Sequence, residues 1–84
     1  MEIEHIKKRL AEKIKTIGLL KASILSERYD EDFLTSGMID SYGFIQFLMF
    51  VESEYDIVIS EEMQIEERIR TINGMTDLIN ELKK

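Results

Sequence analysis

Hydrophobic residues recur at helical spacing near the start of the chain. Apolar side chains placed three or four residues apart form one face of a helix, and that face can be buried against a core. The chain has such a series at Ile3, Ile6, Leu10, Ile14 and Ile17. We therefore predict a first amphipathic helix over residues 2–17, with Gly18 as its stop.

A second series follows Asp40, a residue type that caps helix N-termini well. The spacing predicts a helix from Ser41 to about Tyr55, ended by Asp56. Its buried stripe comprises Phe44, Phe47, Leu48, Val51 and Tyr55. The short apolar run over residues 57–59 is expected to tether the chain to the core.

Two more helices are predicted after this run. Ser60 can cap a brief helix that runs to about Arg68, with acidic residues in its first turn. Thr71 can cap a last helix, since apolar residues again follow at helical spacing. The core stripe of that helix comprises Met75, Leu78, Ile79 and Leu82.

Residues 18–40 have no sustained hydrophobic period. A connection this long is unusual in a compact domain unless it is functional or contains a short helix. Its apolar residues are expected to hold it to the core: Leu19, Leu20, Ile24, Leu25, Phe33, Leu34, Met38 and Ile39. The predicted fold class is all-α, a single domain over residues 1–84 with three longer helices, one short helix and a long first connection.

Charge is unevenly spread along this acidic chain of net charge −6. Six basic and three acidic residues give residues 1–24 a charge of +3, whereas five basic and fourteen acidic residues give residues 25–84 a charge of −9. Such a body repels nucleic acid and anionic membranes and attracts a basic protein surface. A requirement for solubility explains the same charge equally well.

The composition also bears on compartment and chemistry. No apolar run approaches the roughly 18 residues of a membrane span, and the acidic start does not have the pattern of a signal peptide. We therefore expect a cytoplasmic protein without a membrane span. The chain has no cysteine, which excludes disulfide scaffolds and thiolate metal sites. Any thioester chemistry would need a thiol from a prosthetic group.

The segment from Gly37 to Tyr42, Gly-Met-Ile-Asp-Ser-Tyr, places Ser41 at a helix N-terminus. Backbone N–H groups there lack intrahelical partners, and the helix dipole favours a phosphate. With the helix and apolar tether that follow, the segment resembles the phosphopantetheine attachment site of acyl and peptidyl carrier proteins. The resemblance extends from about Asp30 to Leu82.

Several expectations follow from this resemblance. It implies a small four-helix carrier bundle in which Ser41 carries 4′-phosphopantetheine, transferred from coenzyme A by a phosphopantetheinyl transferase. Asp40 would support the presentation of Ser41 to that enzyme and its metal. Further partners would be an acyl- or aminoacyl-adenylating ligase and a downstream transferase or synthase. The chain itself would be a monomer, would not be an enzyme, and would hold no metal.

A partner surface is expected on the second helix, opposite its core stripe. Tyr42, Ile45, Gln46, Met49 and Ser53 fall on one face there. Large apolar residues on a solvated face indicate a binding surface. Alternatively, part of this face packs under the long first connection.

The residues after Ser41 differ from those of carriers in fatty-acid synthesis, which place several acidic residues there. The Asp-Ser-aromatic-Gly arrangement, with Tyr42 and Gly43, is more similar to D-alanyl carrier proteins. The two large rings of Phe44 and Phe47 leave less room between the helices. We therefore expect apolar docking to a dedicated partner and a short acyl or aminoacyl cargo.

Alternative interpretations exist for several residues. An unmodified helical adaptor would bind one partner through Tyr42, Ile45 and Met49. Asp30 and Asp32 begin like a calcium loop, but the positions that need glycine and glutamate do not match. His5 is expected on the solvated side of the first helix. The remaining acidic residues, Glu61, Glu62, Glu66 and Glu67, are expected to form a solvated helix face.

Overall fold

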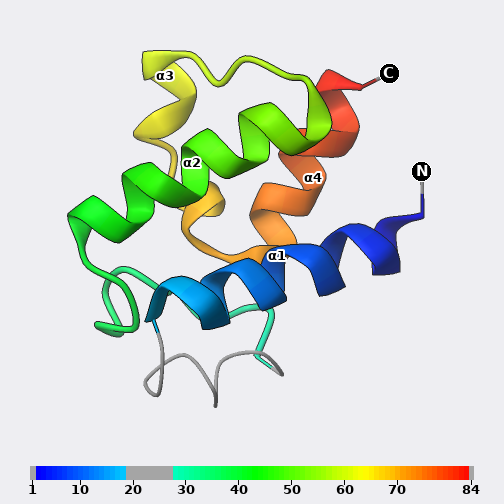
Figure 1. Ribbon diagram of the computed structural model, residues 1–84. Helices are drawn as coiled ribbons and strands as arrows, with labels where there is room; N and C mark the ends of the chain where they lie inside the picture. The colour runs from blue at the N-terminus through cyan, green and yellow to red at the C-terminus, as the bar shows by residue number, and fades with distance from the viewer. Residues whose placement is uncertain (1, 19–27, 84) are drawn as a thin grey trace.

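Four α-helices and one 3₁₀ helix make up the computed structural model, which describes residues 2–18 and 28–83. The elements are α1 (Ile3–Gly18), α2 (Ser41–Tyr55), α3 (Glu61–Gln64), the 3₁₀ helix η3 (Glu67–Arg70) and α4 (Ile72–Leu82). Helix α1 packs against both α2 and α4, and the start of α1 and the end of α4 lie on the same side of the molecule (Figure 1). The all-α prediction, with three longer helices and one short one, is confirmed.

Helix α1 buries most of its predicted stripe. Ile6, Leu10 and Ile14 are fully buried, as is Ala11 beside them. Ile3 is 45% exposed, so its predicted place in the core was wrong. Ile3 is the first residue of α1, and this end of the helix extends beyond the core.

Helix α2 has the predicted bounds and the predicted cap. The Asp40 carboxylate accepts a hydrogen bond from the Gly43 N–H at 2.8 Å, which satisfies one of the unpaired donors of the first turn. Asp56 ends the helix in the left-handed conformation, with φ 53°. The stripe Phe47, Leu48, Val51 and Tyr55 is buried, while Phe44 is half-buried.

The apolar run after α2 alternates between core and solvent. Ile57 and Ile59 are buried, whereas Val58 between them is 79% exposed. The Ile59 N–H donates to the Glu52 carboxylate at 2.9 Å, which ties the run back to α2. The predicted tether is therefore present as a short extended segment with two anchors.

The third predicted helix was too long. Ser60 caps α3 as expected, accepting from the Met63 N–H, but the helix ends at Gln64 and not at Arg68. Met63 packs on the core and Ile69 is fully buried. Six residues apart on an α-helix, these two side chains would point about 120° away from one another. Instead, residues 65–66 are not helical, and the separate helix η3 places Ile69 in the core.

Helix α4 follows the prediction closely. The Thr71 hydroxyl accepts from the Gly74 N–H at 2.9 Å and caps it. Met75, Leu78 and Ile79 are buried, together with Ile72 and Thr76, which the predicted stripe did not include. Leu82 is half-buried at the edge of the core.

Phe33 anchors the described part of the first connection, residues 28–40, in the core. Phe33 is fully buried, and its ring centroid lies 6.1 Å from that of Phe44 and 5.2 Å from that of Phe47. Its N–H donates to the Arg70 carbonyl. Ile39 is also buried, and Leu34 and Met38 are half-buried. The other predicted anchors, Leu19, Leu20, Ile24 and Leu25, lie outside the described residues.

Candidate functional site

Ser41 is the first residue of α2, and it is exposed. Two local features hold it there. Gly37 adopts φ +79°, which suits glycine, and its N–H closes a turn on the Leu34 carbonyl. Ile39 is buried next to Asp40 and donates its N–H to the Phe33 carbonyl. The start of α2 is therefore anchored to the core while the serine faces solvent.

The field at Ser41 comes from the helix itself. The first N–H groups of any α-helix lack intrahelical acceptors and carry a partial positive charge. Here Asp40 satisfies the Gly43 N–H with its carboxylate and the Phe44 N–H with its carbonyl. The first two N–H groups of α2, those of Ser41 and Tyr42, precede these bonds. This arrangement suits a phosphate diester on the Ser41 hydroxyl.

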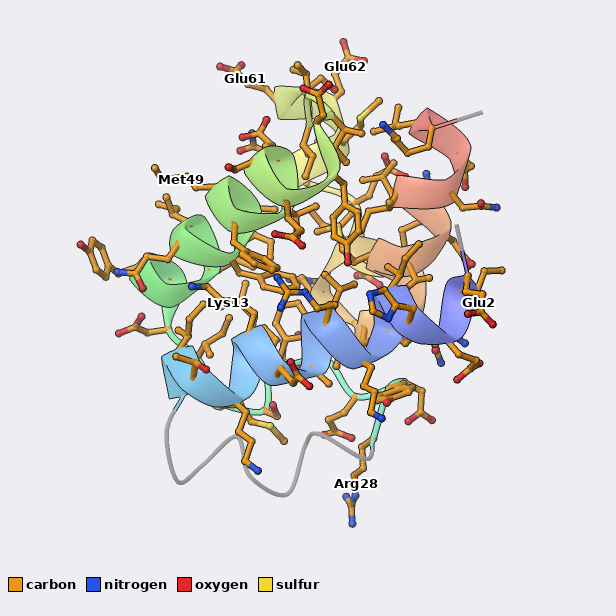
Figure 2. All side chains as sticks on the ribbon, turned by 45° about the vertical axis from the view of Figure 1, so that its right-hand side comes forward. Glu2, Lys13, Arg28, Met49, Glu61 and Glu62 are labelled. Carbon is orange, nitrogen blue, oxygen red and sulfur yellow. The ribbon has the colours of Figure 1, made fainter. Side chains whose placement is uncertain are left out.

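Beside Ser41 runs an exposed line on α2, which we define as Tyr42, Ile45, Gln46, Met49 and Ser53. Tyr42 is 71% exposed, Ile45 54% and Met49 64%. Gln46 and Ser53 are exposed as well. Figure 2 shows Met49 projecting from the outer side of α2. Residues 28–40 do not cover this line, so three large apolar side chains there face solvent.

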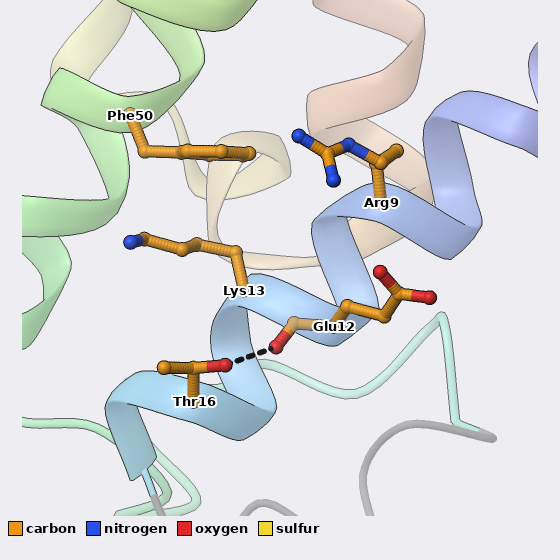
Figure 3. A pocket seen from close by; sticks show the side chains of 5 residues that line it. All are labelled: Arg9, Glu12, Lys13, Thr16 and Phe50. Carbon is orange, nitrogen blue, oxygen red and sulfur yellow. Dashed lines mark hydrogen bonds between the residues drawn. The ribbon is translucent and has the colours of Figure 1, made fainter.

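A groove lies between α1 and α2 on the edge of this line, with a volume of about 250 Å³. It is lined by Arg9, Glu12, Lys13, Thr16 and Phe50 (Figure 3). The Lys13 ammonium lies 5.1 Å from the centroid of the Phe50 ring, and the Arg9 guanidinium lies 5.8 Å from it. Both distances are within the range of cation–π attraction.

Sequence reasoning did not identify this groove. The available signal was the pair Arg9 and Lys13, which are four residues apart on the wet side of α1. Phe50 was a second signal, since it is apolar but falls outside the core stripe of α2. Only packing of α1 against α2 brings the two signals together. Arg9 also pairs with Glu54 at 2.9 Å, which links the same two helices.

The other candidates have structural or solvated roles. Asp32 accepts from the N–H groups of Leu34 and Thr35, and its other oxygen lies 3.3 Å from Arg70 Nε. Its carboxylate therefore shapes the connection. His5 is exposed, as predicted. The described residues contain no group of three or more His, Asp or Glu side chains placed to hold a metal ion.

The predicted acidic face divides between two elements. Glu61 and Glu62 are exposed in the first turn of α3 and extend outward in Figure 2. Glu66 pairs with Arg68, which also pairs with Glu81, and Glu67 pairs with Arg70. The hydrogen bonds that Arg68 donates to the Glu81 carboxylate raise the pKa of Arg68 above its ordinary value. Arg68 therefore links η3 to the end of α4 through an ion pair.

The comparisons add no assignment. No protein-family model, curated protein or solved structure matches the chain. Among the described helices, none is long and apolar enough to cross a membrane.

Proposed function

We propose that this chain is an acyl or aminoacyl carrier protein. It would hold its cargo as a thioester on 4′-phosphopantetheine attached to Ser41 and present that cargo to separate enzymes. The observation that carries the proposal is the exposed Ser41 at the first position of the capped helix α2, beside an exposed apolar line. The chain would not itself be an enzyme.

The residues present fit the proposed group. Ser41 Oγ would form the phosphodiester, with release of adenosine 3′,5′-bisphosphate from coenzyme A. The N-terminal end of α2 favours the negative charge that this linkage adds. The bound group would supply the thiol that a chain without cysteine lacks. Asp40 would have two roles, as the cap of α2 and as support for the transferase reaction.

The exposed line on α2 is the proposed docking face for the partner enzymes. These are the phosphopantetheinyl transferase, the adenylating ligase that loads the arm and the enzyme that unloads it. Tyr42, Ile45, Gln46 and Met49 would contact them. Each enzyme must leave before the next one binds, and a small exposed surface next to Ser41 suits such brief contacts.

Intact mass tests the proposal. The purified chain is incubated with coenzyme A and a broad-specificity phosphopantetheinyl transferase, and we expect the mass gain of one phosphopantetheine. Ser41→Ala should abolish this gain. Ser36→Ala, at an exposed serine of the connection before α2, is the control outside the proposed docking face and should be modified like the parent. An unmodified parent, in a reaction that modifies a known carrier, would contradict the proposal.

A second candidate is an unmodified helical adaptor. The observation that favours it is the exposed line itself, because Tyr42, Ile45 and Met49 face solvent whether or not Ser41 is modified. In that case Ser41 would have only a structural role at the start of α2. Failure of the mass experiment would favour this candidate.

A further inference from the structure

We propose that the exposed line on α2 and the groove between α1 and α2 form one docking surface, and that its partner presents apolar side chains next to carboxylates. This deepens the proposed function, because it names the chemistry of the partner at the same face. It rests on the docking role of that face but not on the modification of Ser41.

The two features are continuous on α2. At 100° per residue, Phe50 lies about 40° around the helix from Gln46. The ring of Phe50 then forms one wall of the groove, with Lys13 and Arg9 of α1 on the other side (Figure 3). A segment that covers Met49 and Gln46 would therefore reach Lys13 with its next side chains.

Charge identifies the partner. Lys13 forms no ion pair with any residue that the structure describes, and its ammonium is held over the Phe50 ring. Arg9 pairs with the single carboxylate of Glu54. Helix α1 carries five basic and two acidic residues, although the whole chain has a net charge of −6. Lys13 is therefore the cation of the groove that pairs with no described carboxylate, and it favours a partner carboxylate opposite it.

Glu12 gives the groove a direction. In Figure 3 its carboxylate lies toward the Arg9 end, while the Lys13 ammonium lies at the opposite end. A partner carboxylate placed near Glu12 would be repelled, whereas one placed near Lys13 would be attracted. The expected partner therefore contacts Ile45 and Met49 with apolar side chains and Lys13 with an acidic side chain. This polarity is opposite to that of an acidic docking helix, which attracts a basic partner.

Matched peptides test this polarity on the unmodified chain. One 16-residue amphipathic helix carries Leu and Phe on one face with Glu beside them, and the second is identical except for Lys in place of Glu. Each is titrated into the ¹⁵N-labelled protein. We expect the Glu peptide to shift the amides of Ile45, Met49, Lys13 and Phe50 together. Its affinity should exceed that of the Lys peptide by about tenfold.

Variants in α1 locate the charge effect. Lys13→Glu should weaken the Glu peptide by about fivefold or more, and Lys13→Gln should give an intermediate loss. Lys15→Glu makes the same charge change at an exposed position outside the groove, so it should have a much smaller effect. The amide spectrum of each variant reports whether it is folded.

Three results would overturn the inference: equal affinity for the two peptides, shifts confined to the exposed line, or no binding of either peptide. The outcome is independent of the mass experiment, because no arm is attached here. A chain that is modified on Ser41 but does not distinguish the peptides would retain the carrier function and lose this docking model.

Discussion

At the scale of single residues, Tyr55 places a polar hydroxyl group in the hydrophobic core. It is only 5% exposed, and its hydroxyl has no hydrogen-bond partner within the described part of the chain. Burial raises the pKa of this phenol above 10.0, and the nearby Glu54 carboxylate raises it further, against the opposing charge of Arg9. A buried hydroxyl without a partner costs free energy that an apolar ring of the same shape does not.

We predict that Tyr55→Phe is neutral or stabilises the fold, by up to about 1 kcal/mol. The effect should depend on pH. Because the folded pKa lies above the unfolded value of 10.0, the parent keeps its full stability below that pH and loses it as the phenol ionises at higher pH. Thermal melts at pH 7 and above pH 10 would show this difference. A large loss of stability at pH 7 would mean that the hydroxyl has a partner.

At the scale of elements, the contact between η3 and α4 depends on a missing side chain. Gly74 lies in the first turn of α4, and a Cβ built there would lie far inside van der Waals contact with the Arg68 carbonyl. That carbonyl belongs to the backbone of η3, so it cannot move like the end of a flexible side chain. At the same position, the Gly74 N–H donates to the Thr71 hydroxyl that caps α4.

We predict that Gly74→Ala destabilises the protein by at least about 2 kcal/mol. Helix propensity alone would give the opposite sign, since alanine is favoured over glycine by about 1 kcal/mol within helices. Gly43→Ala is the matched control, because Gly43 also occupies the third position of its helix and donates to the cap. Its new Cβ would meet side-chain atoms and not backbone, namely the Ile17 γ-methyl at 2.8 Å and Ile39 Cβ at 3.2 Å. Urea denaturation should therefore show a clearly smaller loss for Gly43→Ala than for Gly74→Ala.

The same scale shows where sequence patterns were sufficient. The bounds of α1 and α2 and the caps at Asp40, Ser60 and Thr71 follow from local rules of spacing and hydrogen bonding. The end of α3 does not, because it depends on burying both Met63 and Ile69 against elements far away in the chain. The hydrophobic period within one segment contains no information about packing against these distant elements.

At the scale of the whole molecule, three rings fill the space between the connection and α2. Phe33 and Phe47 are fully buried and stack edge to face, and Phe44 is tilted against Phe33. Interiors packed in this way resist the entry of further methylene groups. This arrangement supports a short cargo that stays near the surface of the proposed carrier.

Octanoylation tests this at the level of the whole domain. We compare two forms of the protein, one that carries octanoyl-phosphopantetheine and one that carries phosphopantetheine without cargo. We predict that they have nearly the same amide shifts in the core, for example at Phe47, Val51 and Leu78. Changes should be confined to the start of α2, because an eight-carbon chain would have to displace the rings to enter. Broad shifts throughout the core would show that the chain is admitted.

Local sequence patterns were sufficient to predict the three longer helices, the caps at Asp40, Ser60 and Thr71, and the position of Ser41 at a helix N-terminus, because these depend on neighbours only a few residues away. They also placed Tyr42, Ile45 and Met49 on one face through the helical period. Three features depend on packing between distant elements: the early end of α3, the close approach of Gly74 to the Arg68 carbonyl, and the groove that Phe50 forms with Arg9 and Lys13. Those features arise where elements far apart in the chain pack against each other, and a pattern within one segment does not specify such contacts.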